Sequence, residues 1–374
     1  MVSWDWLRTK HRKLRRPLPR WVYEPAAVGV ARFLLGRFSR SHNFFPRVAD
    51  DLDAFADEWL AGKGGPMADH FLRELEQSDA LVYNGENSLY RNTLEGTRAL
   101  FFLWLAKTRL GKPTCIINHT AHPTSVRAMM TAMIRKVYPV LDLVTCREAA
   151  SLKLLHRMGI DRAELVPDVV YWLQEEGEAK ERVAEWLADN GLETWSYVCM
   201  SASGLPVSRP RGNWDGAYSL LVRRVQERTG LQTVLVARDV PCQFLEESAR
   251  RTGSIYFGPE HHFTELWPLF RQAAALVTGH FHYAIIASIG GCPFVPLSAN
   301  NHKMAGLSTM LGWAPTEPFD VTDLLTCGEA VIDRLLILLE QRPVLSSRLA
   351  ERAAQLREQV GTLPSRVAAR VGRT

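Results

Sequence analysis

Short apolar segments alternate with longer segments of helical periodicity along the first half of the chain. The apolar runs are Ala80–Asn84, Thr114–Asn118, Leu141–Cys146 and Ala163–Val170. The helical segments between them are Thr97–Leu110, Ser125–Val137 and Glu148–Met158. This alternation is typical of right-handed strand–helix–strand crossovers, so it predicts a parallel sheet in this half of the chain.

The same alternation starts again after a polar and highly charged segment, residues 174–194, which we predict to be a helix bridging two domains. The second set of apolar runs is Tyr197–Met200, Thr233–Ala237, Ser254–Phe257, Ala274–Thr278 and Phe294–Leu297. Helical segments separate these runs, and the tail of the chain is helical again. The pattern therefore predicts a second parallel sheet.

Two such halves predict an α/β fold in which two Rossmann-like domains face a cleft. The length of 374 residues agrees with this division, because one core seldom grows past roughly 250–300 residues. The predicted parts are an N-terminal arm (1–40), a first domain (41–173), a linker helix (174–195), a second domain (196–345) and a C-terminal helical tail (346–374). Ligands bind such sheets at the carboxyl ends of the strands, so the residues after each apolar run are candidates for function.

The charge distribution and the cysteines exclude some classes of function. Residues 1–40 hold ten basic and two acidic side chains, whereas the rest of the chain holds 35 basic and 38 acidic ones. A nearly neutral body argues against a nucleic-acid-binding protein with a broad basic face. The six cysteines lack zinc-ligand spacing, which predicts reduced thiols, no metal site and a cytoplasmic location. No apolar stretch reaches the ~18–20 residues that span a bilayer, and no secretory signal is visible.

The N-terminal arm combines tryptophans with basic residues. Trp4, Trp6 and Trp21 lie among lysines and arginines, a combination that suits anionic lipid head groups. Residues 1–24 are therefore a candidate for peripheral contact with the inner face of a membrane. The alternative is a basic arm that packs on the protein's own surface, since three prolines break any long amphipathic helix here.

Polar side chains follow the predicted strands of the first domain. Asn84, Gly85 and Glu86 end the first run, either as a ligand loop or as a turn. His119 and His122 follow the second run, and an imidazole can act as a base because it titrates near neutrality. We expect one of these two histidines to be structural only.

Charged and hydroxyl side chains follow the next strands. Arg147 after the third run could clamp an anion or form an ordinary ion pair. Asp168 after the fourth run could accept hydrogen bonds at the cleft or fix a turn. In the second half, Ser201 opens a Ser-Ala-Ser-Gly segment that could present backbone N–H groups to phosphate, and Arg238 is a further cation.

The densest group of candidates lies between residues 278 and 303, at two adjacent strand ends beside helix N-termini. Histidines and a lysine gathered there suit an anionic ligand and proton transfer. The residues concerned are Gly279, His280, His282, Ser298, Asn300 and Lys303.

Taken in order, these segments resemble the polysaccharide pyruvyl transferase family. The family has an Asn-Gly-Glu-Gly-(Ser/Thr) tip, an Arg-Glu-x-x-Ser segment and a Pro-Asp pair. It then has Thr-Gly-Arg-Phe-His, Gly-x-Pro-Phe and Ser-Asn-x-x-Lys. The matching segments are Asn84–Ser88, Arg147 with Glu148 and Ser151, Pro167–Asp168, Thr278–His282, Gly291–Phe294 and Ser298–Lys303. His280 stands where the family has Arg, and Asn87 where it has the last Gly of the tip.

The resemblance implies a GT-B-like fold and a defined reaction. The enolpyruvyl unit of phosphoenolpyruvate moves onto two hydroxyls of a sugar, giving a cyclic pyruvate ketal and phosphate. The acceptor would be a sugar of a polysaccharide or of its lipid-linked precursor. His282 would be the acid and Glu86 or His119 the base, while Lys303, His280 and Arg147 bind the anionic groups. The reaction requires no metal or cofactor.

Two other functions remain open at this stage. The first is a GT-B glycosyltransferase that uses a nucleotide-activated sugar in cell-surface polysaccharide synthesis. The helix expected after His282 lacks the acidic residue with which many such enzymes hold a ribose, and this argues modestly against it. The second is a non-catalytic sugar-binding or assembly partner in polysaccharide synthesis.

Overall fold

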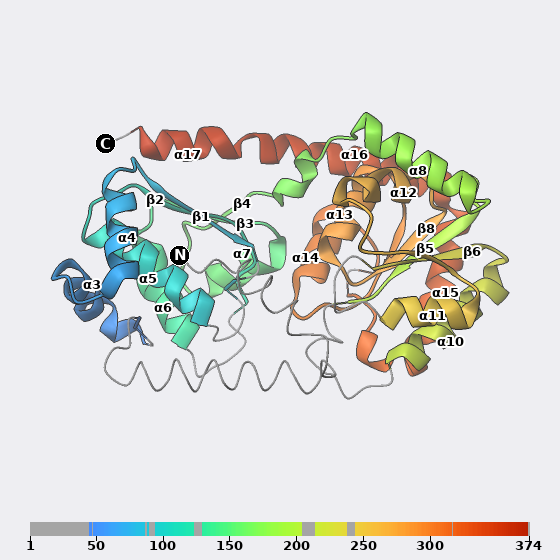
Figure 1. The fold of residues 1–374 in the computed structure, drawn as a ribbon, viewed down its shortest axis with the longest axis horizontal. Helices are drawn as coiled ribbons and strands as arrows, with labels where there is room; N and C mark the ends of the chain where they lie inside the picture. Colours follow the sequence, from blue (N-terminus) through green and yellow to red (C-terminus); the bar gives the residue numbers. More distant parts are fainter. Residues whose placement is uncertain are drawn as a thin grey trace.

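Two parallel sheets, each covered by helices, organise the chain in the computed structural model (Figure 1). The structure describes residues 45–46, 48–86, 88–89, 94–122, 129–203, 214–237, 244–315 and 317–372. The predicted N-terminal arm and Arg238 lie outside the described residues. The predicted α/β fold of two domains facing a cleft is confirmed.

The first sheet has the strand order β1-β2-β3-β4, and every pair is parallel. Its strands are β1 (Leu81–Glu86), β2 (Thr114–His119), β3 (Leu143–Cys146) and β4 (Glu164–Leu165). The helices around it are α3 (Leu52–Leu60), α4 (Gly65–Glu76), α5 (Leu94–Thr108), α6 (Met129–Val137) and α7 (Ala149–Arg157). Trp59, Phe101 and Tyr138 are among the largest buried side chains that join these layers.

The fourth strand is much shorter than the apolar run Ala163–Val170 predicts. Pro167 has no N–H to donate to a neighbouring strand, so the ladder cannot continue through it. Asp168 then caps a short 3₁₀ helix, η3 (Val169–Trp172), by accepting a hydrogen bond from the backbone N–H of Val170 at 2.9 Å. The end of the first sheet is thus held by a buried carboxylate.

The second sheet has the strand order β7-β6-β5-β8-β9 and is also parallel. Its strands are β5 (Tyr197–Ser201), β6 (Gln232–Val236), β7 (Ile255–Phe257), β8 (Ala275–Thr278) and β9 (Phe294–Pro296). The helices are α8 (Gly177–Asp189), α10 (Trp214–Thr229), α11 (Phe244–Thr252), α12 (Leu266–Gln272), α13 (Phe281–Ile289), α14 (Lys303–Leu311) and α15 (Leu324–Glu340). The strand order reverses between β5 and β8, which is where such sheets form ligand crevices.

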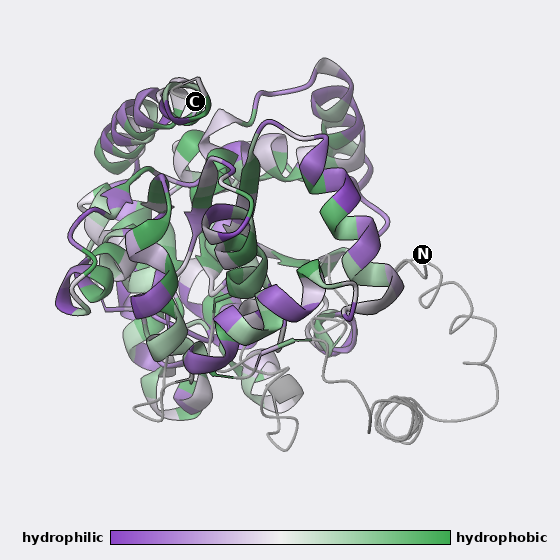
Figure 2. Ribbon diagram, turned by 90° about the vertical axis from the view of Figure 1, so that its left-hand side faces the viewer, coloured by the Kyte–Doolittle hydropathy of each residue, from purple (hydrophilic) through white to green (hydrophobic). Residues whose placement is uncertain are grey.

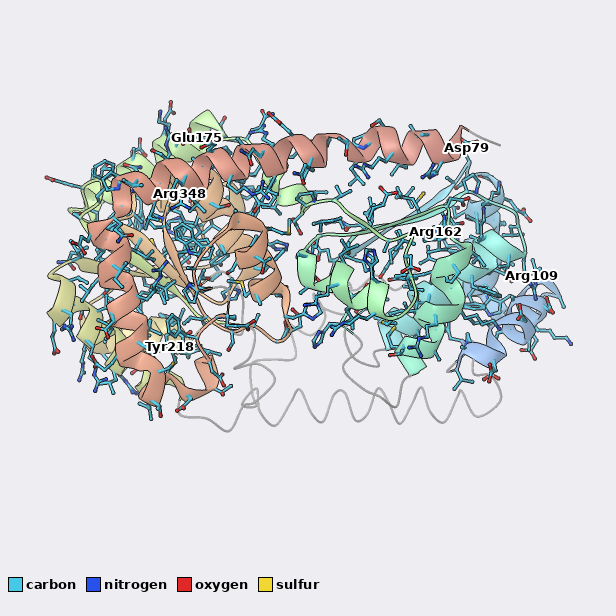
Figure 3. All side chains as sticks on the ribbon, turned by 180° about the vertical axis from the view of Figure 1, so that it is seen from behind. Asp79, Arg109, Arg162, Glu175, Tyr218 and Arg348 are labelled. Atoms are coloured by element: carbon cyan, nitrogen blue, oxygen red, sulfur yellow. The ribbon has the colours of Figure 1, made fainter. Side chains whose placement is uncertain are left out.

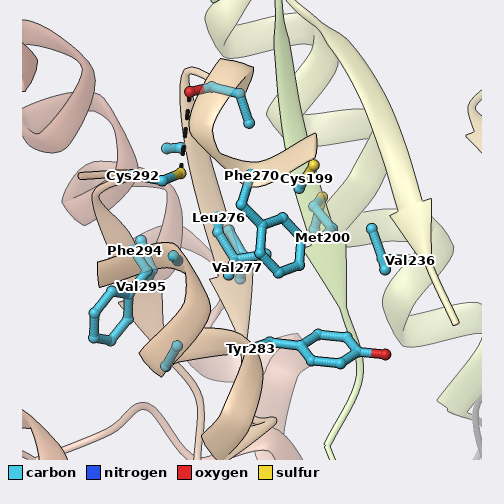
Figure 4. Close-up of a cluster of buried hydrophobic side chains, with 14 of the residues drawn as sticks. Cys199, Met200, Val236, Phe270, Leu276, Val277, Tyr283, Cys292, Phe294 and Val295 are labelled. Atoms are coloured by element: carbon cyan, nitrogen blue, oxygen red, sulfur yellow. Dashed lines mark hydrogen bonds between the residues drawn. The ribbon is translucent and has the colours of Figure 1, made fainter. Parts of the chain in front are cut away.

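Side chains of the central strands and of α13 form the core of the second domain (Figure 4). Met200, Leu276 and Val277 are completely buried there, and so are the thiols of Cys199 and Cys292. Figure 2 shows this arrangement over the whole molecule: the strands inside are hydrophobic, and the helices outside carry both hydrophobic and hydrophilic residues.

Two C-terminal helices connect the domains. α16 (Arg342–Gly361) packs on η3, and α17 (Leu363–Val371) reaches β3, so the end of the chain returns to the first domain (Figure 1). Arg366 on α17 forms an ion pair with Glu164 on β4. No helix among the described residues is long and apolar enough to cross a membrane.

Candidate active site

The two domains meet where α7 packs against α14, and charged side chains from both domains gather at this junction. Arg147 lies just before α7 and Asp168 just before η3, both after strands of the first sheet. His282 lies in the first turn of α13, and Lys303 is the first residue of α14. The structure therefore brings together four residues that the sequence placed at separate strand ends.

Arg147 is the centre of this group. Its guanidinium is 2% exposed, donates to Asp168 Oδ2 at 2.7 Å and donates through Nε to Thr120 Oγ1 at 3.0 Å. Its Nη1 also lies 3.2 Å from Nε2 of His282, which belongs to the other domain. The ring of Phe281 covers the guanidinium at 4.8 Å. A buried cation with these contacts has a fixed orientation.

Asp168 is the carboxylate of the group and is 1% exposed. Burial alone would raise its pKa, but the contact with His282 and the charge of Arg147 outweigh burial and lower the pKa to about 2. Asp168 Oδ2 lies 3.6 Å from Nε2 of His282, whose side chain is 36% exposed. Asp168 is therefore ionised at neutral pH and places a negative charge beside the ring of His282.

Lys303 supplies a second cation beside Arg147. Burial and the charge of Arg147 lower its pKa to about 8, against the opposing effect of Asp168, Glu86 and Glu148. Its Nζ lies 6.0 Å from the centre of the Phe281 ring, which Arg147 also contacts. Two cations on one ring form a positive site at the domain junction.

His119 is placed very differently. It is fully buried, with Nδ1 2.8 Å from the carbonyl oxygen of Thr145 and Nε2 2.8 Å from the hydroxyl of Tyr138. The carbonyl can only accept, so Nδ1 carries the proton and Nε2 accepts from Tyr138. Burial lowers the pKa of His119 to about 4. Both nitrogens are occupied within the core, which favours a structural role over that of the base.

The tip of β1 holds the other predicted residues of the first domain. Glu86 is exposed and has a positive φ of 38°. Asn84 is exposed too, and its side-chain oxygen accepts from Asn118 at 3.2 Å. Gly85 packs on His119, since a Cβ there would lie 2.6 Å from that of His119. The glycine thus allows β1 to approach the buried histidine.

In the second domain, hydroxyl groups close the crevice between β5 and β8. Ser201 Oγ and Thr278 Oγ1 lie 2.6 Å apart, and Ser203 Oγ donates to the carbonyl of Ser298 at 2.6 Å. A Cβ at Gly279 would lie 2.5 Å from that of Ser203, so only glycine fits between these loops.

Two further predicted residues lie at the same edge. His280 is the N-cap of α13, and its ring lies 4.8 Å from that of Tyr283. The side-chain oxygen of Asn300 is buried and has no hydrogen-bond partner among the described residues. Such an acceptor is expected to be satisfied by a bound group.

His122, the other histidine considered as a base, pairs across the domains with His302, which was not among the predicted site residues. His122 Nδ1 lies 2.7 Å from His302 Nδ1, and His302 Nε2 lies 3.2 Å from Ser151 Oγ and 3.5 Å from Glu148 Oε1. Glu148 is fully buried and accepts hydrogen bonds from Ser151. A Cβ on Gly306 would lie 2.2 Å from Glu148 Oε2, so α14 approaches α7 closely. In the sequence, the Arg-Glu-x-x-Ser segment and the histidine before Lys303 were the features that could have indicated this contact.

Solved structures with the same architecture are distant in sequence. The chain is similar to UDP-GlcNAc 2-epimerase from Neisseria meningitidis bound to UDP-GlcNAc, with 11% identity, TM-score 0.55 and coverage of 84% of this chain and 81% of that chain. It is also similar to a glycosyltransferase from Rickettsia africae, with 8% identity, TM-score 0.54 and coverage of 90% and 84%. Arabidopsis thaliana UGT89C1 complexed with UDP-L-rhamnose gives 12% identity, TM-score 0.53 and coverage of 88% and 84%. The fold is therefore GT-B-like.

A comparison with curated proteins found no match. A model of one protein family, described as polysaccharide pyruvyl transferase, matches residues 4–301. The match includes Arg147, Asp168 and His282 and extends to two residues before Lys303. This chain belongs to the polysaccharide pyruvyl transferase family and is a transferase.

Proposed function

We propose that the protein transfers the pyruvyl group of phosphoenolpyruvate to two hydroxyls of a sugar in a polysaccharide or its lipid-linked precursor. The observation that carries the proposal is the group formed by Arg147, Asp168, His282 and Lys303 at the domain junction. It combines two cations with a carboxylate-supported histidine. An anionic donor that must be protonated on carbon requires this combination.

Phosphoenolpyruvate carries a phosphate and a carboxylate, and the junction offers a cation for each. Arg147 is fixed by its contacts with Asp168 and Thr120 and presents a planar fork of N–H donors. Lys303 is a mobile point charge beside it. His280 and the unpartnered oxygen of Asn300 are further candidates for the donor or sugar, together with Asn84, Ser201, Gly279 and Ser298.

His282 is the acid of this mechanism. It gives a proton to the methylene carbon of the donor, whose double-bond electrons form the new C–H bond. A sugar hydroxyl attacks the resulting cationic carbon and loses its proton to Glu86. The C–O bond to phosphate breaks, and the departing phosphate takes the proton from Glu86. The second hydroxyl then attacks the same carbon, returns a proton to His282 and closes the ketal.

Glu86 is preferred as the base over His119. Its side chain is exposed at the tip of β1, and its charge acts on Lys303, so it lies within electrostatic reach of the donor site. His119 is closed off within the core. Asp168 acts through His282 and is a positioning residue.

We also propose that residues 1–24 hold the enzyme at the inner face of a membrane, where a lipid-linked acceptor would be found. The support is the density of tryptophans and basic residues in this segment. Sedimentation with anionic liposomes tests the proposal: the full chain should pellet and a form lacking residues 1–24 should not. Equal pelleting of both forms would refute it.

Ligand-dependent thermal stability tests the donor. Phosphoenolpyruvate at about 100 times its Kd should stabilise the protein by about 2.7 kcal/mol, which a melting curve resolves. Lys303→Ala should lose most of this stabilisation, while Lys180→Ala, an exposed lysine on α8, should retain it. Stabilisation by one nucleotide-sugar and not by phosphoenolpyruvate would instead identify a glycosyltransferase.

A further inference from the structure

A cavity lies at the far end of α14, away from the domain junction. It has a volume of about 640 Å³ and lies between the end of α14, α15 and α16. Small-molecule sites usually have volumes of about 300–1,000 Å³. Lys303 begins α14 and Leu311 ends it, and nine helical residues span ~13 Å. A small molecule bound at Lys303 therefore does not fill this cavity.

Of the described residues that line the cavity, three are arginines and one is acidic. Arg334 belongs to α15, while Arg348 and Arg352 belong to α16, as does the acidic residue, Glu351. None of the three guanidiniums forms an ion pair with a carboxylate in the part of the chain that the structure describes. Figure 3 labels Arg348 on the long C-terminal helix. The cavity thus carries an excess of positive charge.

Capping of α14 explains part of this arrangement. Arg352 donates through Nε to the carbonyl of Met310, in the last turn of α14, at 2.7 Å and through Nη1 to Gln355 Oε1 at 2.8 Å. Arg334 donates to the carbonyl of Ala314, in the segment that follows α14. Arginines commonly bind the free carbonyls at helix C-termini. These hydrogen bonds do not account for two of the arginine groups in the cavity. Nε of Arg334 is buried without a partner, and among the described residues Arg348 has no hydrogen bond or ion pair.

A buried guanidinium nitrogen without an acceptor is costly unless a ligand supplies one. Burial also lowers the pKa of Arg334, and no carboxylate opposes the effect. Several arginine forks that converge on one space match the oxygens of a phosphoryl group. The remaining lining includes Gln341, which suits a hydroxyl group, and the apolar side chains of Leu345 and Leu349. Gln355 and Thr309 also line the cavity; Gln355 accepts from Arg352, and Thr309 donates to the carbonyl of Ala305.

We propose that this cavity binds a small phosphorylated sugar, with the phosphoryl group held by Arg334, Arg348 and Arg352. The site is distinct from the catalytic junction and does not depend on which donor that junction uses. The sugar hydroxyls of the ligand, which can donate, would face the carbonyl end of α14, whose other end carries Lys303.

Calorimetric titration of the full chain tests this proposal with inorganic pyrophosphate, glucose 1-phosphate and glucose as probes. Lys303→Ala serves as the background, because it weakens anion binding at the junction. About one equivalent of each phosphorylated probe should still bind, and glucose should not. Adding Arg348→Ala should weaken binding at least tenfold, because it removes a charge-assisted hydrogen bond. Adding Arg357→Ala, on the same helix but outside the cavity, should change the Kd less than twofold.

Three results would overturn the proposal. One is that neither phosphorylated probe binds in the Lys303→Ala background. Another is that the substitutions of Arg348 and Arg357 weaken binding equally. The third is that glucose 1-phosphate fails to bind although pyrophosphate does, which would remove the sugar from the proposed ligand. Folding does not confound these results, because Arg348 is exposed and a melting curve checks each variant.

Discussion

Two histidines, His119 near the end of β2 and His282 shortly after β8, lie at similar positions in the sequence pattern but differ in burial. His119 is the last residue of β2, and His282 follows β8 after a short turn, in the first turn of α13. His119 has no exposed surface, and both of its ring nitrogens are bonded within the first domain. His282 is about a third exposed and contacts Asp168 and Arg147 across the domain junction.

This difference shows that a strand-end position does not by itself make a histidine catalytic. A proton can be exchanged with a substrate only by a nitrogen that the substrate can reach and whose charged form is stabilised. His119 satisfies neither condition, because burial lowers its pKa to about 4. His282 differs on the first condition, because its side chain is accessible, and its ring lies 3.6 Å from the carboxylate of Asp168 and 3.2 Å from the guanidinium of Arg147.

The largest expected effect is a loss of turnover when His282, the partly exposed histidine at the domain junction, is replaced. His282→Ala should lower kcat by ~10²–10⁴, the usual contribution of a positioned acid. Initial rates of phosphate release from phosphoenolpyruvate, with an acceptor glycan, measure it. His156→Ala is the matched control, since this histidine is exposed on α7 and, among the described residues, hydrogen-bonds only to the carbonyl of Ala163. Turnover of the His282 variant within tenfold of the native value would remove this residue as the acid.

Replacing His119, the buried histidine of the first domain, should instead lower the free energy of unfolding. His119→Leu leaves the hydroxyl of Tyr138 and the carbonyl of Thr145 buried without partners, at about 1–3 kcal/mol each. Urea unfolding measures the loss, and kcat per folded molecule should stay within a few-fold of native. A stable variant with a large loss of kcat would assign His119 to catalysis and abolish the contrast with His282.

The pH dependence of unfolding gives a second check on His119. Its folded pKa of about 4 lies below the unfolded value of 6.5, so the unfolded chain binds the proton first as pH falls. The native protein should therefore lose about 3 kcal/mol of stability between pH 6.5 and 4 through this residue. The part of the pH dependence that belongs to His119 should be missing in His119→Leu.

The sequence was sufficient to predict most of the strands and helices and to single out candidate site residues at the strand ends. Apolar runs predicted β2 and β3 closely, because buried parallel strands are continuously apolar. β1 was predicted as closely, although it is an edge strand and half of its residues are exposed. Arg147 and Asp168 could be proposed because carboxyl ends of adjacent parallel strands share one edge. The sequence could not tell which of His119 and His122 is buried. That depends on Tyr138, a bonding partner 19 residues away whose side chain direction no local pattern encodes.

Contacts between the domains were the other part that could not be predicted. His302 meets His122 and Ser151, which lie 180 and 151 residues away in the sequence. Only the packing of α14 on α7 brings them together, and this packing depends on a glycine, Gly306, beside the buried Glu148. A pattern within one segment carries no information on such a pairing.

The smallest expected effect is a change in KM with pH, which distinguishes the roles of Lys303 and Arg147 at the domain junction. Lys303 has a pKa lowered to about 8, so it loses its charge as pH rises through 8, whereas Arg147 stays charged. If the donor must meet both cations, its KM should rise up to tenfold for each pH unit above about 8, with kcat less affected. Lys303→Arg should move this rise to much higher pH, because a guanidinium does not deprotonate in the range. Asp168, with a pKa of about 2, stays ionised throughout and cannot cause the rise. An unchanged KM profile in Lys303→Arg would mean that Arg147 alone holds the donor.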